Sequence, residues 1–153
     1  MKEIPLTQGK VALVDDEDYP HLSAFKWHLN AGYAARSHPW DGKRRRTFMH
    51  DQLLPAPPGF FTDHRNRNRL DNRRENLRIS TRSQNAANRR LPRTNTSGFR
   101  GVHRSGRGWA ATITCAGKHY YLGTFDTPEE AATAYDKKAL ELFGEFASLN
   151  KAL

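Results

Sequence analysis

Residues 63–88 hold the pattern that most limits what this chain can fold into. An Asp63-His64 pair closes a short apolar run, and Asn76 follows His64 by 12 residues, inside a second apolar stretch. A capping-box signature, Thr81-x-x-Gln84, then predicts the start of a helix. These signals together predict a strand, a polar arginine-rich loop, a second strand and a helix.

The polar residues of this pattern suit the hydrolysis of a phosphodiester. One metal ion can support that reaction if oxygen ligands hold the ion, a base takes a proton from water and another group orients the base. Asp63 and Asn85 can supply oxygens, and His64 can be the base. Asn76 can orient the histidine by accepting its other ring N–H. Oxygen ligands favour a hard cation, Mg²⁺ or Mn²⁺, over Zn²⁺.

On these residues and spacings, residues 49–88 resemble the HNH endonuclease family, in the variant with Asn at the last position that occurs in phage homing endonucleases. The resemblance implies a ββα-metal motif, with the Asp-His pair on the first strand and the middle Asn on the second. It also implies that Asp63 and Asn85 bind the metal, while His64 and Asn76 serve catalysis. An unrelated surface Asp-His pair is the alternative.

The charge of the chain is concentrated in its middle. The net charge is +9, and residues 63–107 hold 13 basic and 3 acidic side chains, all the basic ones being Arg. Arg binds phosphate through a planar fork, so this segment predicts nucleic-acid binding rather than a merely solvated surface. The candidate DNA contacts before the C-terminal segment are Arg65, Arg67, Arg69, Arg73, Arg74, Arg78, Arg89, Arg90 and Arg93.

Size and composition allow one ordinary domain or two to three small modules in 153 residues. The mean hydropathy is −0.84, so each module is short of apolar area. Cys115 is the only cysteine, which excludes an internal disulfide and a multi-cysteine zinc ribbon. No apolar run approaches the roughly 18 residues of a membrane span, and the N-terminus has no signal core. We therefore expect a protein of the bacterial cytoplasm that does not bind membranes.

Residues 1–48 are typical of a small β-rich module, with a strand at 11–14, a hairpin closed by Asn30-Ala31-Gly32 and a second turn at residues 40–43. Phe25, Trp27 and Tyr33 are its expected core. The acidic residues 15–18 favour a helix start over a metal site, because consecutive acids do not converge on one ion.

Two basic features near this module are open to more than one interpretation. Residues 44–46 are three consecutive arginines, which could contact a phosphate backbone or be solvated only. His50 lies on a short predicted helix before the nuclease motif. A role beside the active site and a buried or surface-satisfied histidine are both open for it, and the second is favoured.

Residues 98–153 follow a basic linker at 91–97 and show three alternating strands and a helix. Thr127 and Glu130 form a capping pair around a proline at the first helical position. Ala132 and Ala139 are small residues on the inner face, which lets the helix lie close across the sheet. One face of the sheet is then left uncovered.

This segment resembles the AP2 DNA-binding domain over nearly all of residues 97–150. The resemblance implies that the uncovered sheet face enters the major groove. It places the following residues toward DNA: Arg100, His103, Arg104, Ser105, Arg107, Thr112, Thr114, His119 and Tyr121. Several of these positions hold Arg, Glu or Trp in plant members but small polar residues, His or Tyr here. Fewer bidentate base contacts are then available. A sheet face that is only solvated is the alternative.

The sequence thus predicts an α+β protein with a β-rich module at 1–48, an HNH nuclease at 49–90, the linker at 91–97 and an AP2-like domain at 98–153. The predicted function is metal-dependent, site-selective cleavage of double-stranded DNA by a homing-type nuclease. No obligatory protein partner is indicated, and a nicking monomer is favoured over a dimer. The alternatives are a DNA-binding regulator whose motif does not cut and, less favoured, an RNA-binding protein.

Overall fold

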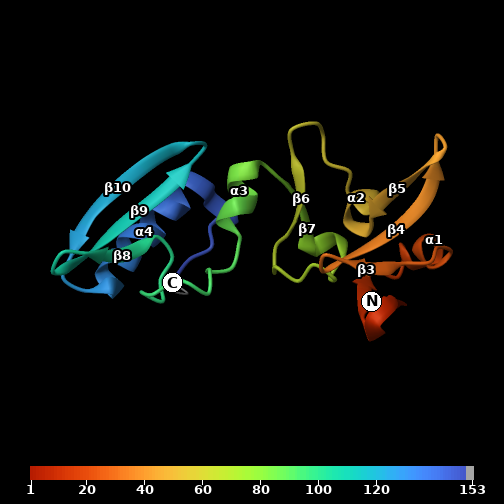
Figure 1. Ribbon diagram of the computed structural model, residues 1–153, viewed down its shortest axis with the longest axis horizontal. Helices are drawn as coiled ribbons and strands as arrows, with labels where there is room; N and C mark the ends of the chain where they lie inside the picture. Colours follow the sequence, from red (N-terminus) through yellow and green to blue (C-terminus); the bar gives the residue numbers. More distant parts are fainter. Residues whose placement is uncertain (151–153) are drawn as a thin grey trace. The chain divides into compact units, whose positions relative to one another are not determined.

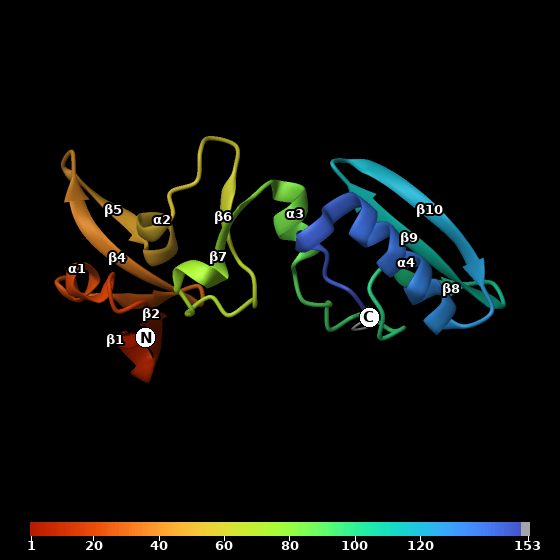
Figure 2. The same ribbon diagram turned by 180° about the vertical axis from the view of Figure 1, so that it is seen from behind.

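A computed structural model describes residues 1–150, which divide into two compact units (Figures 1 and 2). The first unit spans residues 1–81, and the second begins at Arg82. The elements of the first unit are β1 (Lys2–Pro5), the 3-10 helix η1 (Thr7–Gly9), β2 (Val11–Val14), α1 (Tyr19–Ser23), β3 (His28–Asn30), β4 (Tyr33–Trp40), β5 (Lys43–Phe48), α2 (Met49–Leu53), β6 (Phe61–His64), the 3-10 helix η2 (Arg74–Asn76) and β7 (Leu77–Ser80). The elements of the second unit are α3 (Arg82–Ala87), β8 (Val102–Ser105), β9 (Gly108–Cys115), β10 (Lys118–Phe125), α4 (Pro128–Phe143) and the 3-10 helix η3 (Gly144–Phe146).

Three small antiparallel sheets build the first unit. β1 pairs with β2, β4 lies between β3 and β5, and β6 pairs with β7. The turn between β3 and β4 has positive φ at Ala31 (50°) and Gly32 (84°), and the turn between β4 and β5 has positive φ at Asp41 (49°) and Gly42 (68°). Two consecutive left-handed residues match the twist of a tight hairpin. The predicted hairpin turns therefore lie where the sequence placed them, whereas β1 had no sequence signal.

One apolar core joins these sheets. Ile4 and Val14 of the first hairpin, Trp27, Met49 of α2 and Leu77 of β7 belong to the same buried cluster. Because the nuclease-motif strand β7 shares this core with the N-terminal residues, the expected boundary between residues 48 and 49 does not separate two cores. The physical reason is size, since neither part has enough apolar area to close a core alone.

A three-stranded sheet and a long helix build the second unit. The strand order is β10-β9-β8, and α4 lies across one face of the sheet (Figures 1 and 2). The side chain of Thr127 accepts from the backbone N–H of Glu130, whose side chain accepts from the N–H of Thr127, so the predicted capping box is formed. Ala131, Ala132 and Ala139 of α4 are buried, as close packing of helix on sheet requires.

Residues 82–97 belong to the second unit, although we expected the nuclease to end at residue 90 and a linker to follow. Ala87 of α3 lies in a buried cluster with Tyr135 and Phe143 of α4. The Oγ of Ser97 donates to the carbonyl of Val102, and the Nδ2 of Asn95 donates to the carbonyl of Phe99. The segment between α3 and β8 is thus held by side-chain hydrogen bonds.

None of the helices in residues 1–150 is long and apolar enough to cross a membrane.

Candidate active site

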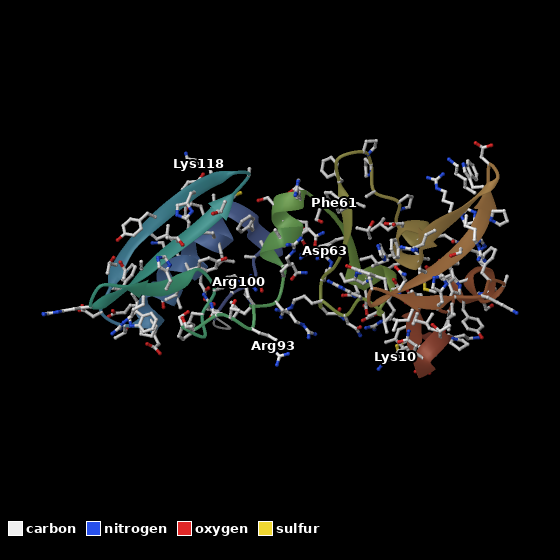
Figure 3. All side chains as sticks on the ribbon, in the orientation of Figure 1. Lys10, Phe61, Asp63, Arg93, Arg100 and Lys118 are labelled. Atoms are coloured by element: carbon white, nitrogen blue, oxygen red, sulfur yellow. The ribbon has the colours of Figure 1, made fainter. Side chains whose placement is uncertain are left out.

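The β6–β7 hairpin carries the Asp-His pair. Asp63 and His64 are the last residues of β6 and lie opposite Arg78 and Leu77 of β7. Figure 3 shows Asp63 on β6, two residues after the exposed Phe61. Asp63 is 7% exposed and His64 is 4% exposed. Two polar side chains buried at the end of one strand require partners inside the protein.

The partner of Asp63 across the hairpin is Arg78. Its Nε lies 3.0 Å from the Oδ2 of Asp63, and both side chains are 7% exposed. A buried carboxylate needs such a partner, because an unpaired charge in a medium of low dielectric is costly. The sequence predicted Arg78 as a DNA contact, but the structure buries it in this ion pair instead.

An unexpected amide holds the ring of His64. The Nε2 of His64 lies 3.3 Å from the Oδ1 of Asn72, and Asn72 is completely buried. The Nδ2 of Asn72 donates to the carbonyl of Leu70, which fixes Oδ1 as the atom that faces the ring. The backbone N–H of Asn72 donates to the carbonyl of Leu13 on β2. This arrangement favours the tautomer of His64 with its proton on Nε2, which leaves the lone pair on Nδ1.

Asn76, the residue that we expected to orient His64, instead braces the loop between the strands. Its Oδ1 accepts from the backbone N–H of Asn66 at 3.0 Å, and its Nδ2 donates to the carbonyl of Asp71 at 2.7 Å. Its backbone carbonyl accepts from the N–H of Arg65. The side chain of Asn76 therefore holds the loop that carries Asn72, and Asn72 makes the contact with the ring. The sequence contained Asn72 but gave no sign of its burial.

Two further rings lie beside His64. The ring centroid of His50 is 5.1 Å from that of His64, and the centroid of Tyr33 is 5.9 Å from His64 and 5.1 Å from His50. His50 also stacks on Phe48, with an interplanar angle of 14°. The structure buries His50, as the favoured interpretation had it, and also places its ring next to that of His64. Tyr33, expected in the core, also belongs to this ring cluster.

Burial sets the charge state of both histidines. Burial, together with a smaller effect of the nearby His64, lowers the pKa of His50 to about 4. Burial also lowers the pKa of His64, although the hydrogen bond to Asn72 and the charges of Asp63 and Asp71 oppose this shift. The buried Nδ1 of His50 has no hydrogen-bond partner within the described residues. A neutral imidazole at His64 is the form that can accept a proton.

The arginines of the loop divide into two groups. Arg73 makes a two-pronged contact with Asp71, and Arg74 makes one with Asp18. These hydrogen bonds raise the pKa of both arginines. The acidic residues 15–18, which we expected to start a helix, therefore supply the partner of Arg74. The backbone N–H of Arg74 also donates to the side chain of Asp15. The sequence could not show this long-range pairing.

Arg65, Arg67 and Arg69 are exposed along the same loop. The guanidinium of Arg69 lies 4.6 Å from the ring centroid of Tyr33 and donates to the carbonyl of Ala31. These exposed arginines follow directly after His64 in the chain, and Arg69 contacts the ring cluster through Tyr33. Arg73, Arg74 and Arg78, by contrast, each have a carboxylate partner.

Asn85, the second expected metal ligand, lies on α3 in the second unit and is half-buried. The Oγ of Ser83 on this helix accepts from the backbone N–H of Ala116. Residues 1–150 contain no group of three or more His, Cys, Asp and Glu side chains that could hold a metal ion. The expected donors, a carboxylate and an amide oxygen, are of the type that hard cations prefer.

The sheet of the second unit has one face without a helix. Register pairs Thr112 with Tyr121 and Thr114 with His119, while Ile113 between them is buried against α4. Thr114 and His119 are joined by a hydrogen bond of 3.1 Å, and both are exposed. These residues therefore form a polar face opposite the helix, as the alternation in the sequence predicted.

The other expected contacts of this unit are placed differently. Arg104 lies opposite Trp109, and its guanidinium lies 4.9 Å from the indole centroid. Its exposed neighbours His103 and Ser105 lie on the opposite face of the sheet. Arg100 is half-buried and donates to the carbonyl of Arg89. The exposed arginines of this unit include Arg89, Arg90 and Arg93 before β8 and Arg107 in the turn between β8 and β9.

Comparison with known proteins identifies the family. The family model described as HNH endonuclease matches residues 55–87, which include Asp63, His64, Asn76 and Asn85. An uncharacterized HNH endonuclease of Acanthamoeba polyphaga mimivirus is 30% identical over 146 residues, which cover 94% of this chain and 76% of the relative.

Two further relatives match parts of the chain. Protein 3.8 of Escherichia phage T7 is 35% identical over 95 residues, 61% of this chain and 78% of the relative. APETALA2-like protein 2 of Oryza sativa is 46% identical over 65 residues, 40% of this chain but only 15% of the plant protein. The match to the mimivirus protein extends over most of both sequences, and the chain belongs to the HNH endonuclease family.

Proposed function

We propose that the protein is a metal-dependent, site-selective DNA endonuclease of the homing type, in which His64 is the general base. The observation that carries this proposal is the His64–Asn72 pair beside Asp63, in a chain of the HNH family. A buried imidazole with one nitrogen fixed by an amide is ready to take a proton on the other. Mimivirus and phage relatives also agree with a mobile-element origin.

The proposed roles of the residues follow from their chemistry. His64 takes a proton from water on Nδ1, Asn72 holds Nε2, and Asn76 keeps the loop that carries Asn72 in shape. Asp63 and Asn85 are the proposed ligands of one Mg²⁺ or Mn²⁺. When bound, such an ion stabilises negative charge on the scissile phosphate and the departing oxygen. Arg78 holds Asp63 in its orientation.

The second unit is the proposed reader of DNA sequence. Its uncovered sheet face presents Thr112, Thr114, His119 and Tyr121, and its resemblance to the AP2 domain supports placing this face in the major groove. Small hydroxyls and one imidazole offer fewer bidentate base contacts than Arg would. We therefore expect modest discrimination by this face, with the exposed arginines supplying affinity without sequence preference.

Plasmid cleavage tests the proposal. Wild-type protein should convert supercoiled plasmid to open-circular or linear product with Mg²⁺ or Mn²⁺, and EDTA should stop the reaction. His64→Ala should lower the rate by at least about 100-fold, the usual contribution of a general base, while DNA affinity stays nearly unchanged. His28→Ala, which alters a half-buried histidine of the same unit on β3, is the matched control and should retain activity.

Two outcomes would contradict the proposal. Full activity of His64→Ala would remove this residue from catalysis. Binding without cleavage of a randomised duplex library would instead support a regulator that recognises DNA and does not cut it. The product form also reports on the favoured monomer, because one active site per chain predicts a nick before any double-strand break.

A further inference from the structure

The β4–β5 hairpin of the first unit carries a concentration of positive charge that the active site does not use. Residues 33–48 contain Arg36, Lys43, Arg44, Arg45 and Arg46, against the single acid Asp41. The four consecutive basic residues are exposed along β5. Within the described residues, none of these four has a carboxylate within ion-pair distance. They differ in this from Arg73, Arg74 and Arg78, which all have carboxylate partners.

The register of the hairpin places basic residues on both of its faces. Residues that lie opposite each other in an antiparallel pair share a face, and neighbours along a strand alternate. Arg45 lies opposite His38 and Lys43 lies opposite Trp40, so these two basic residues share one face. Arg44 and Arg46 lie opposite Pro39 and Ser37, on the other face. The ribbon is therefore positive on its two sides.

An exposed aromatic ring accompanies this charge. Trp40 is 60% exposed, and the guanidinium of Arg45 lies 5.3 Å from its ring centroid. Figure 1 shows β4 and β5 as a ribbon that reaches away from α1 and α2 toward its turn, and side chains stand out around it in Figure 3. An exposed indole beside an arginine gains little for the fold but suits a sugar or a base edge.

We propose that the β4–β5 hairpin is a DNA-contacting element of the first unit, which enters a groove of duplex DNA. A groove is bordered by a phosphate backbone on each side, and the major groove, about 12 Å wide, admits a two-stranded ribbon. Charge on both faces matches two backbones at once, whereas a membrane or another flat anionic surface would need charge on one face only. Side chains two residues apart are about 7 Å apart along the strand, so Arg44 and Arg46 contact separate phosphates.

This inference deepens the proposed function, since it rests on duplex DNA as the partner, but binding can be measured without cleavage. The test uses the full chain with His64→Ala, so that no DNA is cut, and a mixed-sequence duplex. The hairpin variant replaces Arg44, Arg45 and Arg46 by Ala. The matched control replaces Lys2, Lys10 and Lys26 by Ala, because these lysines are also exposed in the first unit and the change in net charge is the same.

The readout is the dependence of the binding constant on salt concentration. Each lost phosphate contact reduces the steepness of the fall of log K with log salt by about 0.9. The slope of the hairpin variant should therefore be smaller in magnitude by about 2 to 3. At about 0.1 M salt its affinity should fall on the order of 100-fold. The control should change both quantities by much less. Equal changes in the two variants would overturn the proposal, since general charge alone would then explain the effect.

Trp40 gives a second, independent measurement. In chains that carry Trp109→Phe, adding duplex should shield the fluorescence of Trp40 from acrylamide. The shielding should be absent when Trp40→Phe is added, and this variant retains the buried Trp27 as a check of folding. Unchanged quenching on saturation with DNA would overturn the placement of the hairpin in a groove. So would a hairpin-dependent affinity for phosphatidylserine vesicles in place of duplex.

The hairpin and the nuclease can fail separately. A wild-type protein that never cuts DNA but shows the hairpin-dependent salt slope would refute catalysis and leave the hairpin contact standing. Cleavage that depends on His64 but does not depend on the three arginines would support catalysis and refute the hairpin contact.

Discussion

Replacement of His50 by phenylalanine should make the stability of the first unit less dependent on pH below neutrality. Burial, with a smaller effect of the neighbouring His64, lowers the pKa of His50 from its ordinary 6.5 to about 4. Between these two values the unfolded chain binds a proton that the folded chain does not. The stability due to neutral His50 is therefore fully present above pH 6.5 and is lost as the pH falls toward 4.

The size of the effect follows from these two values. One pKa unit corresponds to about 1.4 kcal/mol, and proton linkage gives a loss of about 2 kcal/mol between pH 7 and pH 5 for this one residue. That is a large share of the stability of a small domain. Phenylalanine keeps an aromatic ring next to Tyr33 and Phe48 and removes the titrating group. The unpartnered Nδ1 is removed with it.

The assay is urea unfolding of wild type and His50→Phe at pH 7 and pH 5. Both chains carry Trp109→Phe, so that Trp27 and Trp40 report on the first unit alone. Between pH 7 and pH 5 the free energy of unfolding of wild type should fall by about 2 kcal/mol more than that of the variant. The same loss in both chains would refute the reasoning, because the pH dependence would then come from groups that the two chains share.

Two further predictions concern the packing of each unit. Arg78→Ala should destabilise the first unit by about 3 to 5 kcal/mol in urea unfolding, because Asp63 stays buried without its guanidinium. Arg74→Ala removes a half-exposed pair and should cost less than about 1 kcal/mol. Equal costs of the two substitutions would contradict this account. Gly101→Ala should destabilise the second unit by more than about 2 kcal/mol by thermal unfolding, since its Cβ would lie 2.2 Å from the ring of Tyr135. Gly106→Ala has open space and a similar positive φ, so it should cost only about 1 kcal/mol, and a larger cost than at Gly101 would refute the steric cause.

Local signals in the sequence were enough to predict most elements. Residues 30–32 and 41–42 mark two hairpin turns, and both turns form with left-handed residues. Thr127 and Glu130 mark the start of α4, and the capping box is present. Such signals depend on neighbours along the chain, so they can be recognised without the fold.

The partners of the polar residues were decided by the tertiary structure. Asn72 and Asn76 are both buried. Asn72 is the one beside the ring of His64, and β2 holds it there through the backbone of Leu13. We expected Asn76 to orient the ring of His64, but its side chain holds the loop instead. Spacing in the sequence fixes which residues are present in the motif, but it does not determine which of two nearby amides faces the imidazole.

The same distinction applies to the charges. The sequence by itself determined that this chain is rich in arginine around an Asp-His pair, and hence that phosphate chemistry was the best hypothesis. Only the fold decided that Arg73, Arg74 and Arg78 are paired with Asp71, Asp18 and Asp63, while β5 leaves its four basic residues in solvent. The physical reason is that an ion pair depends on the distance between charged atoms, and distances between remote segments are set by packing of the core.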